Sequence, residues 1–130
     1  MKPEAKFYQY WKKNTPNISH TRLENTSSLG TPDALCYNKK GTFFTIEFKV
    51  TKRNKSGYSR PKFSPHQIAF HVKHPLNSFI LVNQQNPLDP WHLKLYTGGK
   101  ILELVDSGLL LDASAVGLVA CRSLLEDLGS

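Results

Sequence analysis

The sequence has few cysteines and no long apolar run. Cys36 and Cys121 follow no metal-binding spacing, and two cysteines do not form a disulfide framework. No apolar stretch reaches the roughly 18 residues that a membrane-spanning helix needs, and no signal peptide opens the chain. These features argue against a disulfide-stabilised secreted module and against a membrane protein, so we expect a cytoplasmic one.

Acidic residues are scarce over the first three quarters of the chain. Residues 1–97 contain 15 lysines and arginines against 5 acidic residues, whereas residues 98–130 contain 2 against 5. The formal net charge is +7. A basic body with an acidic end predicts a polyanionic partner on one part of the surface. The alternative is a basic surface that serves only solubility, and charge alone does not separate the two.

The 130 residues are enough for one domain with one core, and their pattern is α/β. Pro3 and the helical spacing of the aromatic residues after it predict a helix over residues 3–13. Ser64 as N-cap and Pro65 behind it predict a helix that runs to about His74. The predicted strands cover 18–24, 33–38, 42–50, 78–83 and 92–96, and further helices are predicted over 98–108 and 114–128.

The predicted β-hairpin over residues 33–50 contains charged residues within its strands. Side chains alternate across a strand, so Glu47 and Lys49 share one face while four apolar residues share the other. The apolar face must be buried against helices. Both charged side chains therefore point together into a cleft on the opposite face.

The turn of this hairpin sets which residues face each other. Gly41 can take the left-handed position that closes a three-residue loop, and this register sets Asp33 opposite Glu47. A two-residue loop would set Asp33 opposite Ile46, on the apolar face, which makes that register the worse one. The two acids and Lys49 then meet at one place.

Two carboxylates at close range repel each other unless a cation or a proton lies between them. Mg²⁺ prefers oxygen ligands and usually takes one or two carboxylates together with water and phosphate. Lys49, on the same face, can stabilise the charge that grows on a phosphate. The plain alternative is a half-exposed pair of Glu47 and Lys49, with Asp33 only beginning a turn.

The motifs Pro32-Asp33 and Glu47-Phe48-Lys49 resemble the PD-(D/E)xK nuclease superfamily. The stretch over residues 22–49, followed by "SPHQIAFH", is similar to the small VRR-NUC and Holliday-junction-resolvase-like nucleases of phages and bacteria. The resemblance covers roughly residues 20–83. It implies a restriction-endonuclease-like fold, with a mixed central β-sheet flanked by helices and a catalytic core over about residues 18–83. It also implies cleavage of DNA that depends on Mg²⁺, for which Mn²⁺ substitutes, inside a bacterial cell or a phage-infected host.

The resemblance further implies a role for individual residues. Lys49 corresponds to the catalytic lysine, and Gln67, on the helix after the hairpin, corresponds to a glutamine that supports the site or the DNA. Together with the two acids, the implied catalytic residues are Asp33, Glu47, Lys49 and Gln67. The implied metal ligands are Glu24, Asp33, Glu47 and the backbone carbonyl of Phe48.

A basic segment without periodicity leaves the hairpin directly after Lys49. Its lysines and arginines fit an arm that grips phosphates, and a flexible solvated loop is the alternative. The predicted DNA-binding residues are Arg22, Lys52, Arg53, Lys55, Arg60 and Lys62.

The sequence therefore predicts a single-domain, Mg²⁺-dependent DNA endonuclease that acts on branched or structured duplex, such as a Holliday junction. One alternative is a restriction-type or repair nicking nuclease. Another is a catalytically silent DNA-binding module on the same fold. A plasmid and branched-DNA cleavage assay with Mg²⁺ and with EDTA separates the last from the others.

The C-terminal residues 98–130 are rich in leucine and valine. This apolar surface exceeds what one small sheet needs, so it predicts a twofold homodimer, aided by Trp11 and Tyr8. The alternative is that this segment completes the core of the monomer.

Overall fold

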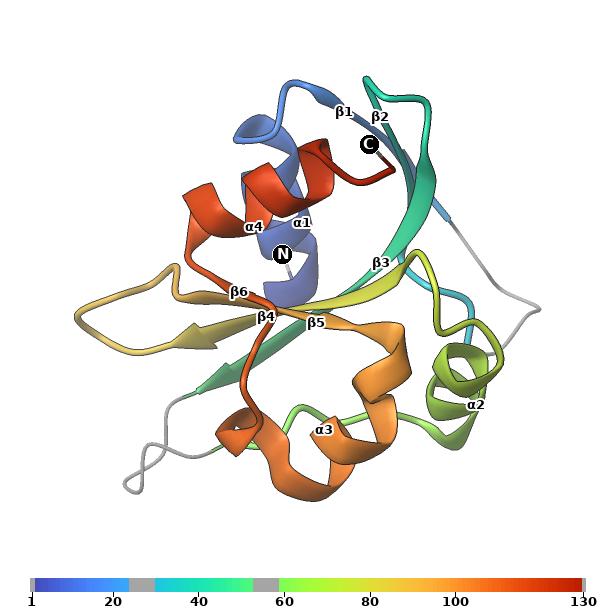
Figure 1. The fold of residues 1–130 in the computed structure, drawn as a ribbon. Helices are drawn as coiled ribbons and strands as arrows, with labels where there is room; N and C mark the ends of the chain where they lie inside the picture. The colour runs from blue at the N-terminus through green and yellow to red at the C-terminus, as the bar shows by residue number, and fades with distance from the viewer. Residues whose placement is uncertain (1, 24–29, 53–58, 130) are drawn as a thin grey trace.

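The chain folds around one twisted sheet, shown for the computed structural model in Figure 1. The structure describes residues 2–23, 30–52 and 59–129. Within them, six strands lie side by side in chain order. They are β1 (Ile18–Arg22), β2 (Ala34–Asn38), β3 (Phe43–Lys52), β4 (Ser78–Gln85), β5 (Leu93–Thr97) and β6 (Ala115–Val116). β3 and β4 are parallel and every other neighbouring pair is antiparallel, so the sheet is mixed, as predicted.

Helix α2 (Pro65–Lys73) makes the crossover between the parallel strands β3 and β4. Its predicted start is confirmed: the backbone N–H of Gln67 donates to Oγ of Ser64 at 3.1 Å. The side-chain oxygen of Gln67 in turn accepts from the backbone N–H of Ser64 at 3.0 Å. This reciprocal capping box fixes where the helix begins.

The remaining helices are α1 (Pro3–Lys13), α3 (Ile101–Ser107) and α4 (Leu118–Glu126). The 3₁₀ turns η1 (Gly98–Lys100) and η2 (Gly108–Leu110) flank α3. The prediction of one helix over residues 114–128 is wrong at its start, because Ala115 pairs with Leu95 as part of β6. Gly117, with φ of 89°, then turns the chain into α4. None of the described helices is long and apolar enough to cross a membrane.

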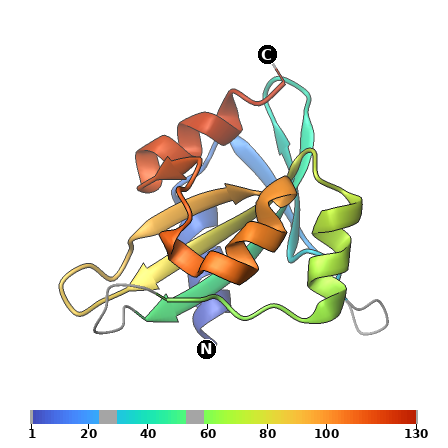
Figure 2. The ribbon, with the colours of Figure 1, turned by 60° about the horizontal axis from the view of Figure 1, so that its bottom comes forward.

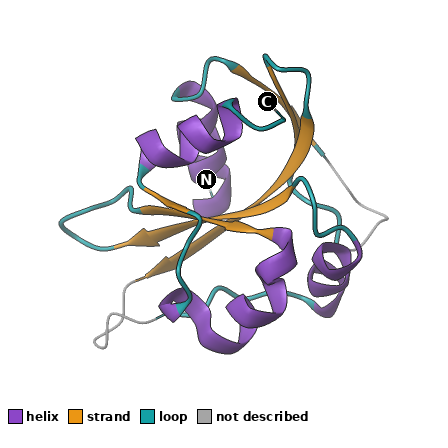
Figure 3. Ribbon diagram, in the orientation of Figure 1, coloured by secondary structure: helices purple, strands orange, loops and turns teal. Residues whose placement is uncertain are grey.

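The helices form one layer on each face of the sheet (Figures 2 and 3). α1 and α4 cover one face, where Trp11 and Leu125 belong to the same buried cluster as the apolar side of β3. α2 and α3 lie on the other face, where Leu104 packs against the strands β4 and β5. The predicted apolar side of β3 faces the α1 and α4 layer, which leaves Glu47 and Lys49 on the side of α2.

The C-terminal residues 98–129 complete both cores of the monomer. Ile101 and Leu104 of α3 are buried on one side of the sheet, and Cys121 and Leu125 of α4 on the other. Both cysteines are free and buried.

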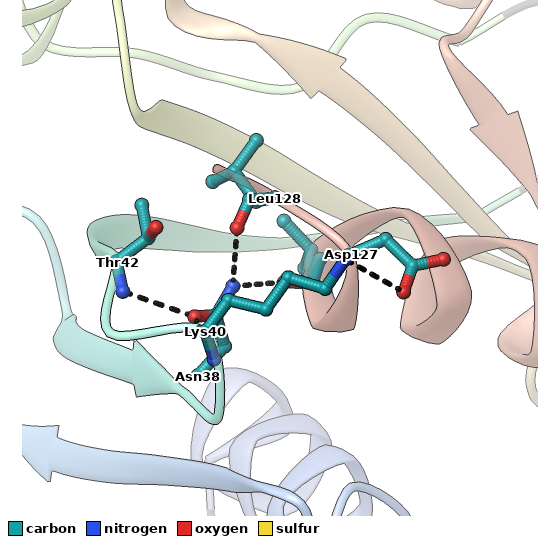
Figure 4. Close-up of polar contacts among 6 residues, drawn as sticks. Asn38, Lys40, Thr42, Asp127 and Leu128 are labelled. Carbon is teal, nitrogen blue, oxygen red and sulfur yellow. Dashed lines mark hydrogen bonds and ion pairs between the residues drawn. The ribbon is translucent and has the colours of Figure 1, made fainter. Parts of the chain in front are cut away.

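Asn38, at the end of β2, ties the C-terminus to the hairpin turn (Figure 4). Its buried side-chain amide donates to the backbone carbonyls of Leu125 and Leu128, each at 2.9 Å. Its side-chain oxygen accepts from the backbone N–H groups of Lys40 and Thr42 at 3.1 and 3.0 Å. One buried amide thus uses its full hydrogen-bonding capacity and holds the turn in the predicted three-residue form.

Candidate active site

β2 and β3 pair in the predicted register. Ala34 lies opposite Ile46, and continuing this register sets Asp33 opposite Glu47. Gly41 has a φ of 79°, which is the left-handed conformation expected for the three-residue loop. The one difference is that β2 begins at Ala34, so Asp33 stands immediately before the strand and not within it.

β2 does not start earlier in the chain because of the residue before Asp33. Pro32 has no backbone N–H to donate to a neighbouring strand. Gly30, with φ of 84°, lies so close to α2 that a Cβ there would overlap the backbone carbonyl of His66. The chain therefore turns away from β3 and packs against the start of α2. Among the described residues, no strand pairs with this edge of β3 beyond Ile46.

The carboxylate of Asp33 takes the first hydrogen bond that this open edge offers. The backbone N–H of Phe48 donates to Oδ2 of Asp33 at 2.8 Å. The N–H and C=O groups of one strand residue point toward the same neighbour. The carbonyl of Phe48 therefore faces the same open edge as the carboxylate, which is the position that the resemblance implies for a metal ligand.

Gln67 holds the other two charged residues together. Its Oε1 accepts a hydrogen bond from Nζ of Lys49 at 3.0 Å, and its Nε2 donates to Oε2 of Glu47 at 3.3 Å. The ammonium group of Lys49 also lies 4.8 Å from the centre of the Phe63 ring. Because Gln67 also belongs to the capping box of α2, the helix start and the site are fixed by the same side chain.

Glu47 is almost completely buried, with 1% of its surface exposed. Its Oε1 has no hydrogen-bond partner. Burial raises the pKa of Glu47 to about 9, the nearby charge of Asp33 adds to this, and Lys49 opposes it. Without a cation, the two carboxylates therefore hold a proton at neutral pH.

This arrangement fits a hard divalent cation. A cation could replace the proton and occupy the unpartnered Oε1 of Glu47, with Asp33 and the carbonyl of Phe48 as further oxygen ligands. No three His, Cys, Asp or Glu side chains form a metal-binding group within the described ranges. Water and phosphate would supply the remaining ligands, as is usual for Mg²⁺.

These residues line a pocket of ≈ 210 Å³, and α1 forms one of its walls. Arg22, one of the predicted DNA-binding residues, lines this pocket, with its guanidinium 5.0 Å from the centre of the Tyr8 ring. Glu4 also lines the pocket, and its charge contributes to the raised pKa of Glu47. Sequence reasoning missed Glu4 because an acid in the first turn of a helix is common for reasons of helix stability alone.

The predicted DNA-binding residues fall into two groups. Lys52, Arg60 and Lys62 line a second hollow of ≈ 330 Å³ that shares Lys49 and Glu4 with the pocket. Arg53 and Lys55 lie outside the described ranges, as does Glu24, which was predicted as a metal ligand.

Comparison with protein-family models, curated proteins and solved structures finds no match to this chain. The residues of the pocket are therefore the basis for its function.

The buried carboxyl of Glu47 predicts how stability depends on pH. Its pKa is about 9 in the folded chain against an ordinary value of 4.5, so the folded state keeps a proton that the unfolded chain releases. Without divalent cations, the contribution of Glu47 to the free energy of unfolding should fall by about 1–3 kcal/mol between pH 5 and pH 8.5. The half-buried His20 and the buried His71, whose pKa values are lowered to about 4, change stability in the opposite direction up to about pH 6.5, so the effect is measured as the difference between the wild type and Glu47→Gln. Glu47→Gln should remove most of this loss, whereas the exposed Glu103→Gln should not. Urea unfolding in EDTA measures both, and equal pH slopes for the wild type and Glu47→Gln would contradict the assignment.

Proposed function

We propose that this protein is a metal-dependent DNA endonuclease that hydrolyses phosphodiester bonds. One observation carries the proposal: Asp33, Glu47 and Lys49 converge in a pocket on the open edge of β3, beside a hollow lined by basic residues. The mixed sheet, with this motif on its hairpin, agrees with the restriction-endonuclease-like core that the resemblance to PD-(D/E)xK nucleases implies.

The oxygen atoms at the open edge would hold Mg²⁺ or Mn²⁺. Asp33, Glu47 and the carbonyl of Phe48 supply three of them, and Glu4 adds a carboxylate to the pocket wall. Glu24 remains a predicted ligand. A bound ion of this kind lowers the pKa of a water molecule and neutralises charge on a phosphate.

Lys49 places a positive charge where a phosphate would react. Gln67 and the Phe63 ring fix its ammonium group, and only one of its three N–H donors is needed for the bond to Gln67. The remaining donors can stabilise the charge that develops on the phosphate oxygens. Gln67 acts as a positioning residue, because it contacts both Lys49 and Glu47.

The basic residues around the pocket fit a nucleic-acid backbone. Arg22 stands on one side of the carboxylates, and Lys52 and Lys62 line the adjoining hollow on the other. A DNA strand that follows the open edge of β3 would pass from one group to the other. We propose branched or otherwise structured duplex as the preferred substrate. A catalytically silent DNA-binding module is the competing function, since it would use the same basic surface.

Removing either central carboxylate should abolish cleavage without unfolding the protein. Asp33→Asn keeps an oxygen that can accept from the N–H of Phe48, and Glu47→Gln relieves the repulsion between the acids. Each variant should lose at least about 100-fold in cleavage rate, as expected when a group that supports the transition state is removed. The measurement is cleavage of supercoiled plasmid and of a synthetic four-way junction with Mg²⁺, with EDTA as the metal-free control. DNA binding without cleavage by the wild type would instead favour the silent module.

Lys49 should contribute mainly to the cleavage rate, and the basic hollow mainly to DNA affinity. Lys49→Ala should lower the cleavage rate more than DNA affinity, because its ammonium group stands at the carboxylates. The double variant Lys52→Ala, Lys62→Ala should do the opposite and reduce the salt dependence of binding by about one unit of slope per lost phosphate contact. Lys39→Ala with Lys73→Ala, two exposed lysines that line neither hollow, is the matched control. An unchanged slope in the Lys52 and Lys62 double variant would move the DNA contact elsewhere.

We also propose that two copies form a twofold dimer, since coordinated cutting of a junction needs two pockets. The expectation that Trp11 and Tyr8 contribute to the interface is wrong, because both are buried in the core of the monomer. The outer edge of β6 is the better surface: it has no strand neighbour among the described residues. Val116 and Val119 beside it are 50% and 64% exposed.

Sedimentation at micromolar concentration should therefore detect a dimer, and Val119→Asp should convert it to monomer by burying a charge in the contact. The control is Val72→Asp, because Val72 is 50% exposed but lies on α2, away from β6. A monomeric wild type that still cuts junctions on both strands would contradict the paired-site proposal.

A further inference from the structure

The hairpin between β4 and β5 holds a leucine out in solvent. Leu88 is 97% exposed, more than any other large apolar residue that the structure describes. Figures 1 and 2 show that this hairpin extends beyond the sheet at the end where β3 finishes. A side chain this exposed contributes nothing to the core and is accessible to a partner.

The tip of the hairpin is held in one conformation. Oδ1 of Asn86 accepts from the backbone N–H groups of Leu88 and Asp89, at 2.9 and 2.8 Å. The backbones of Asn86 and Asp89 also bond to each other in both directions, at 3.2 and 3.3 Å. The backbone of the turn is thus already ordered before any partner binds. Binding through Leu88 therefore costs little further backbone entropy.

The base of the hairpin is anchored to the rest of the domain. The side chain of Asn83 donates to the carbonyl of Pro90 and accepts from the N–H of His92, both at 2.9 Å. The Trp91 ring stacks on the Tyr10 ring of α1, with centroids 3.9 Å apart and planes 4° apart. Leu88 is therefore presented at a fixed place relative to α1 and the pocket.

The basic edge of β3 leads from the pocket to this hairpin. Lys52 pairs with Gln85 at the end of the sheet, and it lines both the basic hollow and a further hollow under the hairpin, formed with Gln85, Asn86, Pro87 and Pro90. The strand from Glu47 to Lys52 spans about 17 Å at the usual rise per residue. That length corresponds to about five base-pair steps of a DNA strand.

We propose that Leu88 is a wedge that inserts between bases of the DNA at the edge of a branch or duplex end, and that it sets the preference for structured substrates. The proposal rests on the proposed nuclease function. Apolar side chains that enter a base step must unstack it, and this costs least where a base is already unpaired. A wedge beyond the end of β3, and so more than about five base-pair steps from the carboxylates, would therefore direct cleavage to a fixed distance from a branch point.

The positive charge that would contact a DNA backbone lies at the base of the hairpin and not at its tip. Asp89 is the acidic residue beside Leu88, and its Oδ2 lies 3.2 Å from Nδ1 of His92. Lys52 adds positive charge at the base of the hairpin. DNA as the partner of the exposed leucine therefore rests on Lys52 and on the basic hollow that continues from it along β3.

Binding without cleavage tests the wedge separately from catalysis. The Glu47→Gln protein, without metal, is titrated with a four-way junction and with a linear duplex, each carrying 2-aminopurine. We expect preference for the junction and a rise in 2-aminopurine fluorescence where the base unstacks at the branch. Leu88→Ala should reduce the preference about tenfold, the effect of losing one buried leucine contact, and should remove the fluorescence rise. Leu76→Ala is the matched control, since Leu76 is 85% exposed and lines neither the pocket nor the basic hollow.

The outcomes separate the two proposals. If Leu88→Ala keeps both the preference and the fluorescence rise, the wedge is overturned, and the exposed leucine would instead be expected to contact a protein. If the preference depends on Leu88 but the wild type cleaves no DNA with Mg²⁺, the wedge is supported and the nuclease assignment fails. If the protein binds no DNA, both are overturned.

Discussion

The site depends on one difference in length: β2 begins only at Ala34, opposite Ile46, while β3 continues past this point to Lys52. The buried Pro32 cannot donate a ladder hydrogen bond, so the chain leaves the sheet and exposes an edge of β3. The Asp33 carboxylate replaces the missing strand at its first position by accepting from the N–H of Phe48. If β2 were longer, its backbone would hydrogen-bond to the carbonyl of Phe48. It would also fill the space of the pocket and of the basic hollow.

The energetic cost of this site is concentrated in Glu47. A buried carboxyl with an unpartnered oxygen beside a second carboxylate destabilises a fold, and such groups are found mainly where function requires them. Two features limit the cost. Gln67 bonds to Oε2 of Glu47, and Lys49 offsets part of the negative charge. Because Gln67 also caps α2, a shift of the helix would disturb the carboxylate and the lysine together.

The C-terminal residues 98–130 have a structural role of their own. They add α3 to one face of the sheet and α4 to the other, and Asn38 bonds the end of α4 to the hairpin turn that sets the register of the site. The segment thus completes the core, as one of the two interpretations of its composition expected. The apolar surface that the segment leaves exposed lies in two places: Val116 and Val119 beside β6, and Leu102 and Leu110 on α3 and η2.

The sequence by itself determined the features that depend on near neighbours in the chain. Alternation and the left-handed Gly41 predicted that Asp33 would face Glu47, and the Ser64-Pro65 pair predicted the start of α2. Only the tertiary structure decided how deeply Glu47 is buried, that Glu4 of α1 joins its pocket, and that Ala115 extends the sheet instead of a helix. These outcomes depend on segments far apart in the chain, whose packing overrides local patterns of residues two to four positions apart.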